Sequence, residues 1–347
     1  MKVNAKRMAE ILLFFGVMVL TFYTFFYQQN PLQILAAVRQ IRISYAVTAF
    51  LLGILFICLE GSMIWYLLHG LGSSCSLPKC IQYSFIGFFY SGITPSATGG
   101  QPMQLYYMQK DGNRTADSTV VLMTVALAYK LVLVLIGIGI MVFWHNSLCS
   151  YLRHYYFLYL IGIGLNILLV MVIGAVMLCP EIIRHITLTI DNLLVRFGIL
   201  KANTTRLGQV EQFIENYRCA VAFLRHNRLK IFVVVCMTFL QRSTVFILTG
   251  IVYKGFGLYT TPVYTVILLQ ACVYIAVDML PVPGAQGITE LMYRAVFIPV
   301  FGAKFLIPSM MVCRAMNFYV LLIISMFVEI WRHSTQFRST WVLTNKK

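Results

Sequence analysis

The sequence contains few charged residues. Asp, Glu, Lys and Arg make up 11% of its 347 residues, and 60% of the residues are hydrophobic. Soluble globular domains carry about 25% charged and about 45–50% apolar residues. So few charges cannot cover a surface that faces water, which excludes a soluble globular domain. Apolar runs close to the ~20 residues needed to cross a bilayer recur along the chain and predict a membrane protein.

Several chemical signatures are also missing. The sequence has no CxxC, no HxxxH or HExxH, and no nucleotide-binding loop. Its nine cysteines are odd in number and scattered, unlike a disulfide framework. We therefore predict no metal site, no cofactor and no coupling to nucleotide hydrolysis.

Acidic residues are scarce: 11 Asp and Glu stand against 27 Lys and Arg, for a net charge of +16. In a membrane protein such an excess is typical of cytoplasmic loops and of contact with anionic lipid. No basic and aromatic module of the kind that binds nucleic acid is present, so no nucleic-acid partner is expected. The basic residues gather at the N-terminus, in 181–230 and in the tail 332–347. All three segments are predicted to be cytoplasmic.

Hydropathy predicts six full spans, at about 8–27, 45–68, 119–143, 156–178, 230–253 and 305–331. Between the first two, Pro31–Arg42 has an amphipathic pattern that suits a helix lying on the membrane surface. Six crossings return both termini to the cytoplasm, in agreement with the charge distribution. The whole chain, 1–347, is predicted to be a single membrane domain.

Two further apolar regions are interrupted by Pro, Gly and small polar residues. The first, 80–108, is broken at Thr94–Pro102, and the second, 262–303, at Leu280–Gly287. Such residues end helices, and broken backbone is tolerated at membrane depth only where protein or a water-filled cavity surrounds it. We predict two re-entrant hairpins. Pro102 suits the first position of the helix that follows the first break.

The order of these elements predicts an internal symmetry. Residues 1–44 hold the first span and the surface helix, and 45–143 form repeat one. Residues 156–229 connect it to repeat two, 230–331, which precedes the tail, 332–347. Each repeat reads span, hairpin, span, in opposite orientation. The fold class is therefore an all-α polytopic membrane protein with about six full transmembrane helices and two re-entrant broken-helix hairpins arranged as inverted repeats, as in secondary transporters.

Candidate site residues fall into two groups. Helix N-termini after the breaks suit a phosphate or carboxylate, and ionisable residues inside spans are costly and usually functional. The predicted headgroup- or phosphate-binding set is Thr98, Gly99, Gly100, Gln101, Gln104, Lys130, Arg242, Gly287, Arg294 and Arg314. The predicted acidic or coupling set is Glu60, Asp278 and Glu290.

The buried charges have alternative explanations. The ionisable residues could simply pair to hold the helices together, and Glu290 could cap its own helix. Four bases against three acids cannot all be neutralised, which favours an anionic guest. Glu329 and His69 lie near span ends and are expected at the membrane interface.

The segment Ser91–Gln104 closely resembles the signature of the lysylphosphatidylglycerol synthase transmembrane family. Pro281–Gly287 with Glu290 looks like that family's second signature. Family members of this length resemble the membrane part of the bacterial multiple peptide resistance factor. There a cytoplasmic synthase moves lysine from lysyl-tRNA onto phosphatidylglycerol. The membrane part carries the product to the outer leaflet, which gives resistance to cationic antimicrobial peptides.

The resemblance implies a flippase-like lipid transporter in a bacterial plasma membrane, for lysyl-phosphatidylglycerol or another anionic or aminoacylated lipid. Gln101 and Gln104 stand where many relatives carry charged residues, which leaves the headgroup open. Two alternatives remain. One is phosphatidylglycerol lysyltransferase activity. The polar segment of about fifty residues is too short to form a catalytic domain for it, and only this alternative would require lysyl-tRNA. The other is a non-transporting membrane subunit. A homo-oligomer or a separate synthase partner would suit either transport or subunit roles.

Overall fold

The structure is a computed structural model that describes residues 32, 39–94, 97–179, 181–182, 184–185, 189, 204–279 and 288–344. All the regular elements in these ranges are helices. The predicted first span, 8–27, and most of the predicted surface helix lie outside the described residues. The predicted total of six spans is therefore not tested.

Five helical segments are long and apolar enough to cross a membrane. They are α3 (Ile43–Gly70), α6 (Thr115–Phe143), α8 (Tyr156–Leu178), α11 (Arg228–Gly255) and the stretch from Ile288 to Arg332. A helix satisfies its backbone hydrogen bonds internally, as a lipid environment requires. The first four agree with the predicted spans to within a few residues. The protein is a multi-pass membrane protein.

The fifth segment reverses direction at Gly302. Within α13 (Ile288–Arg314), Gly302 has φ +66°, a conformation open to glycine because it has no Cβ. The Tyr293 hydroxyl donates to Ser309 Oγ at 3.2 Å, so the two parts of α13 pack against each other. The second part continues through a π-helical turn, η4 (Ala315–Tyr319), into α14 (Val320–Thr344). The last span therefore starts after Gly302, close to the predicted residue 305.

Three apolar helices are shorter. The helices α4 (Leu77–Ile93) and α5 (Gly100–Lys110) pack together as a hairpin, and α12 (Val263–Val277) packs against α13. At 1.5 Å per residue, none of the three reaches the ~30 Å of a bilayer core. The chain is broken between α4 and α5, as predicted, although α5 begins at Gly100 rather than at Pro102. Residues 95–96 and 280–287 lie outside the described ranges.

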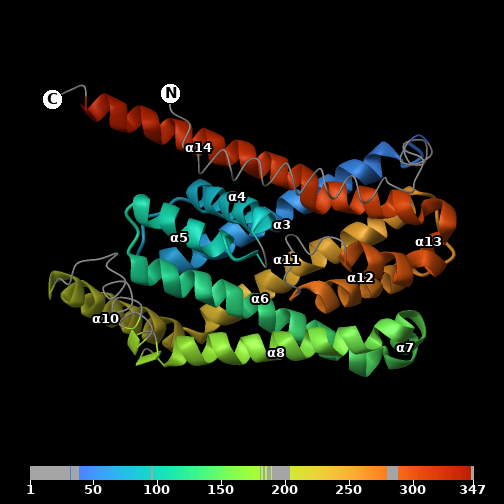
Figure 1. The fold of residues 1–347 in the computed structure, drawn as a ribbon, viewed down its shortest axis with the longest axis horizontal. Coiled ribbons are helices and arrows are strands. Elements are labelled where there is room, and N and C mark those ends of the chain that lie inside the picture. The colour runs from blue at the N-terminus through green and yellow to red at the C-terminus, as the bar shows by residue number, and fades with distance from the viewer. Residues whose placement is uncertain are drawn as a thin grey trace.

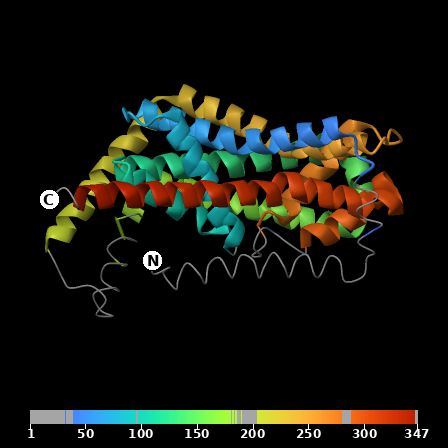
Figure 2. The same cartoon turned by 90° about the horizontal axis from the view of Figure 1, so that it is seen from above.

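The long helices run roughly along one axis, with α3 and α11 side by side (Figures 1 and 2). The outer ends of α4 and α5, the helix α10 (Thr204–His226) and the end of α14 lie toward one end of the molecule (Figure 1). The short helix α7 (His145–Leu152) and the bend in α13 lie toward the other end. We call these the α10 end and the α7 end.

The basic segment 181–230 was predicted to be cytoplasmic, without any helix. It contains α10, which packs on α6. Its buried residues Ile214, Tyr217, Val221 and Leu224 recur at steps of three and four, the spacing of one helix face. This spacing is visible in the sequence and could have predicted the helix. A one-turn helix, Arg153–Tyr155, links α7 to α8.

Candidate functional site

The α4–α5 hairpin and the helices α12 and α13 border one cavity of about 560 Å³. Ala97 and Thr98, after the break in the first hairpin, line it. So do Asp278, Met279 and Thr289, which flank the gap between α12 and α13. Side chains from α3, α6, α8, α11 and η4 complete the wall. The cavity has the size of a small-molecule or headgroup site.

One ion pair in the wall joins the two predicted repeats. Lys130 Nζ, on α6, lies 2.5 Å from Asp278 Oδ2, just after α12. The Tyr129 hydroxyl donates to the other oxygen of Asp278 and lies 3.2 Å from the Tyr274 hydroxyl. Asp278 is therefore held by a cation and by a phenol, which satisfies a buried carboxylate.

A second ion pair lies within α13. Arg314 Nε is 2.8 Å from Glu290 Oε1, and both side chains are largely buried. The two residues come from opposite sides of the Gly302 bend. Glu290 therefore pairs with a cation across the bend, a contact that capping of its own helix would not provide.

Arg242 and Glu60 are the remaining charges in the wall, and neither forms an ion pair within the described part of the chain. Arg242, on α11, is 7% exposed and donates to the Tyr274 hydroxyl at 3.1 Å. Its guanidinium carbon lies 3.7 Å from the centre of the Tyr129 ring, a cation–π contact. Glu60, on α3, accepts a hydrogen bond of 2.7 Å from Gln104 Nε2.

Most of the predicted site residues meet at this cavity. Its lining includes Thr98, Gly100, Gln101, Gln104, Lys130, Arg242, Arg314, Glu60, Asp278 and Glu290. Gly99 is not in the wall, and its N–H donates to Thr94 Oγ1 at 2.9 Å instead. Arg294 is exposed and outside the cavity. Gly287 lies outside the described residues.

The exclusion of Arg294 corrects one sequence argument. The wall holds three acids, Glu60, Asp278 and Glu290, and three bases, Lys130, Arg242 and Arg314. The formal charges of these six side chains balance. The predicted excess of positive charge, and with it the preference for a purely anionic guest, does not hold for the wall.

Three polar partners were missed in the sequence. Tyr129 and Tyr274 lie between Arg242 and Asp278, and Gln241 accepts from Arg242 at 3.3 Å. The chain has 20 tyrosines, and composition does not separate these two from those that anchor or pack.

Glu329 was expected at the membrane interface, and the structure buries it instead at 8% exposure. Its Oε1 accepts hydrogen bonds from Tyr90 on α4 and Tyr107 on α5. Glu329 therefore joins α14 to the first hairpin. His69, in contrast, is exposed at the last turn of α3.

The sequence profile described as the lysylphosphatidylglycerol synthase TM region matches residues 8–325. The chain belongs to this family. The family ties this membrane protein to the handling of lysylphosphatidylglycerol or related lipids. The match covers α4, α5, α12 and α13 and every residue that lines the cavity. A comparison with curated proteins finds no match.

Proposed function

We propose that this protein is a flippase-like translocase that passes a phospholipid headgroup through the cavity while the acyl tails stay in the bilayer. The headgroup carries both a phosphate and a cationic amine. Lysyl-phosphatidylglycerol is the leading candidate, because it bears a phosphate and amino groups and because the family is associated with it.

The observation that supports this proposal is an acid and a base in the cavity wall, Glu60 and Arg242, that form no ion pair with any residue the structure describes. They attract each other only at longer range, whereas the other four charges of the wall form ion pairs. Charges at membrane depth are costly and are retained mainly for function. Arg binds phosphate through parallel N–H donors, and a carboxylate binds an ammonium group. A headgroup with both charges would satisfy both residues at once.

The arrangement of the helices supports transport. We interpret the two hairpins as re-entrant elements that enter from opposite sides, so that their breaks meet at the cavity. Inverted repeats of this kind hold substrate near the bilayer midplane and expose it alternately to the two sides.

Charge gives the orientation we propose. Basic residues are more numerous at the α10 end than at the α7 end. The α10 end has Lys79, Lys110, Arg114, Arg184, Arg218, Arg225, Arg228, Lys230 and Arg332, and the α7 end has Arg39, Arg42, Arg153, Lys254 and Lys304. Basic residues favour the cytoplasmic side. The α10 end, with the end of α14, would face the cytoplasm of a bacterial cell.

The test is lipid exchange between leaflets in proteoliposomes, with fluorescent phosphatidylglycerol and lysyl-phosphatidylglycerol in parallel. Arg242→Gln should abolish exchange of both lipids, because both carry the phosphate. Glu60→Gln should slow lysyl-phosphatidylglycerol by about tenfold, the effect of ~1.4 kcal/mol, and leave phosphatidylglycerol little changed.

Arg294→Gln is the control, since it removes the same charge as Arg242→Gln from a residue of α13 that is exposed outside the cavity. It should leave both rates unchanged. Wild-type rates equal to those of empty liposomes for both lipids would contradict translocation. Transfer of lysine from lysyl-tRNA to lipid by the purified chain would instead support the lysyltransferase alternative.

A further inference from the structure

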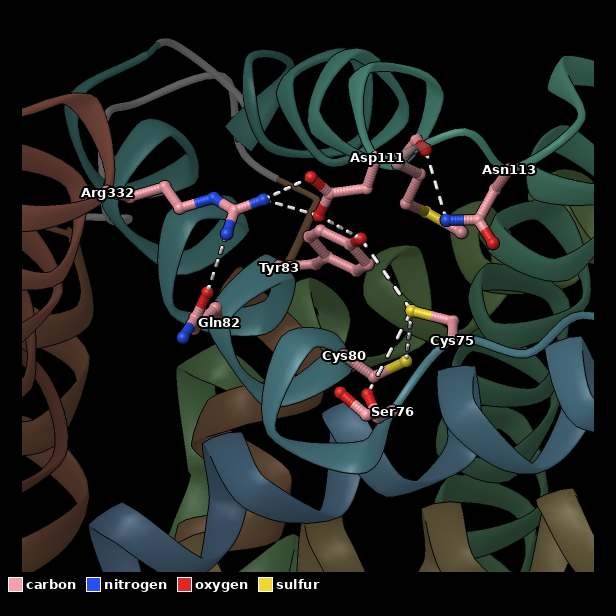
Figure 3. A network of polar contacts seen from close by, with 9 residues as sticks. Cys75, Ser76, Cys80, Gln82, Tyr83, Asp111, Asn113 and Arg332 are labelled. Carbon is pink, nitrogen blue, oxygen red and sulfur yellow. Dashed lines mark hydrogen bonds and ion pairs between the residues drawn. The ribbon is translucent and has the colours of Figure 1, made fainter. Parts of the chain in front are cut away.

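Two of the nine cysteines lie next to each other, away from the cavity. Cys75 is in the loop between α3 and α4, and Cys80 is in the first turns of α4. Their sulfur atoms are 3.6 Å apart (Figure 3). Cys80 is fully buried and Cys75 is half-buried, so one sulfur is reachable from outside and the other lies behind it.

The local sequence explains why the two sulfurs meet. Ser76 is the N-cap of α4, which places Cys75 one residue before the cap and Cys80 at the fourth helical position. Side chains at these two positions often pack together as a hydrophobic staple that fixes the entry of the chain into the helix. Here both members of the staple are thiols, so a packing contact also brings two reactive sulfurs together.

The surroundings activate Cys75. The hydrogen bond donated by the Cys80 thiol, followed by contacts with Tyr83 and Asn113 and the positive charge of Lys79, lowers the pKa of the Cys75 thiol to about 6 against the opposing effect of burial. A thiol with this pKa is mostly thiolate at neutral pH, and the thiolate is the nucleophilic form.

A polar network holds this arrangement in place (Figure 3). The Tyr83 hydroxyl, 3.7 Å from Cys75 Sγ, donates to Asp111 at 2.6 Å, and Asp111 is paired with Arg332 of α14. The Cys75 N–H donates to Ser73 Oγ. The loop is thus fixed to the first hairpin and to the last helix, and the two sulfurs are held in register.

We propose that Cys75 and Cys80 form a reactive dithiol site that a small hydroperoxide oxidises to a disulfide. The Cys75 sulfur attacks the hydroperoxide, an S–O bond forms as the O–O bond breaks, and the reduced oxygen fragment leaves as an alcohol or water. The Cys80 sulfur then attacks the Cys75 sulfur, and the hydroxyl group leaves as water with the Cys80 proton. Two thiols are oxidised and one hydroperoxide is reduced.

The consequence would be a covalent clamp at the start of the first hairpin. A sulfenic acid on Cys75 has a partner already in place, so oxidation stops at the disulfide before reaching the irreversible sulfinic stage. The site lies at the α10 end and does not contact the cavity.

The test treats full-length protein in proteoliposomes with hydrogen peroxide, blocks the remaining thiols with N-ethylmaleimide and maps the cysteines by mass spectrometry. Cleavage after Lys79 separates the two cysteines, so their disulfide appears as a linked pair of peptides. We expect this pair to form before Cys219 is oxidised. Cys219 is the control because it is exposed on α10, at the same end of the molecule.

Two variants separate the roles of the sulfurs. In Cys80→Ser the sulfenic acid on Cys75 should persist and be trapped by dimedone. In Cys75→Ser, Cys80 should remain reduced under the same treatment. Oxidation of Cys75 at the rate of Cys219, or oxidation of Cys75 in the unaltered protein without the linked pair, would overturn the proposal. The readout is the thiol state, so its result is independent of whether lipid exchange is observed.

Discussion

Tyr90 and Tyr107 donate to the same oxygen of Glu329, at 3.1 and 2.8 Å. The carboxyl group is almost completely enclosed, and a buried polar group without its partners costs more than a normal hydrogen bond gains. A single carboxyl group thus joins α14 to the first hairpin, although these elements are far apart in the sequence. Sequence reasoning placed Glu329 at the membrane interface and missed its partners, because a hydrogen bond over 222 residues has no local signal.

Removing one of these donors should weaken the join between α14 and the first hairpin. Tyr107→Phe keeps the ring and deletes the hydroxyl, so the free energy of unfolding in mixed micelles should fall by about 1–3 kcal/mol. Tyr106→Phe is the matched control, since Tyr106 is the exposed neighbour on the same helix. Equal effects of the two changes would show that the Glu329 contact contributes nothing.

The helices themselves were largely predictable, because long apolar runs determine where a chain can cross a bilayer. Both predicted ends of α8 and the predicted C-terminal end of α6 agree with the structure, whereas α6 begins at Thr115 and not at the predicted residue 119. The reversal agrees with the predicted turn between the second hairpin, 262–303, and the last span, from about 305. That Gly302 makes the turn was not predicted, because one glycine in an apolar run gives little warning and the flanking helices decide whether it bends the chain. The distance between two packed helices was also not predictable, because it depends on the side chains of both helices. Gly162 on α8 lies against α12, and an added Cβ would be 2.4 Å from the Ile275 carbonyl oxygen.

Gly162 and Gly164 offer a test of helix packing with two positions on one helix. Gly162→Ala forces α8 and α12 apart and should destabilise the protein by about 1–3 kcal/mol. A Cβ added at Gly164 would meet no atom within 4 Å, so Gly164→Ala should be neutral or stabilise by up to about 1 kcal/mol. Thermal unfolding in detergent measures both. A stable Gly162→Ala variant would mean that close approach is not required.

For the whole molecule, the predicted set of charged residues can be compared with the wall of the cavity, which contains all of them except Arg294. Lys130 and Asp278 are 148 residues apart, and both were in the predicted set because ionisable residues inside apolar segments are costly and usually functional. What the sequence could not provide is which charges pair. Pairing depends on distances of a few ångströms that packing sets. Among the described residues, Lys130 and Asp278 form an ion pair, whereas Arg242 and Glu60 form none.

The orientation predicts which cysteines a membrane-impermeant maleimide reaches in intact cells. In a background without other cysteines, Ser150→Cys on α7 should be labelled from outside, because the α7 end would face outward. Native Cys219 on α10, which is exposed, should be labelled only after the membrane is made permeable. The reverse pattern would invert the topology and leave the fold unchanged.

The π-helical turn η4 places one extra residue between Arg314 and α14. Each residue of an α-helix turns the chain by about 100°, so a π-turn is equivalent to a single-residue insertion in the helix. The side chains that follow η4 are therefore rotated about the helix axis relative to those of an uninterrupted α-helix. Glu329 meets its tyrosines and Arg332 meets Asp111 in this rotated frame. A homologue that lacked the inserted residue would need a different set of partners along the whole of its last helix.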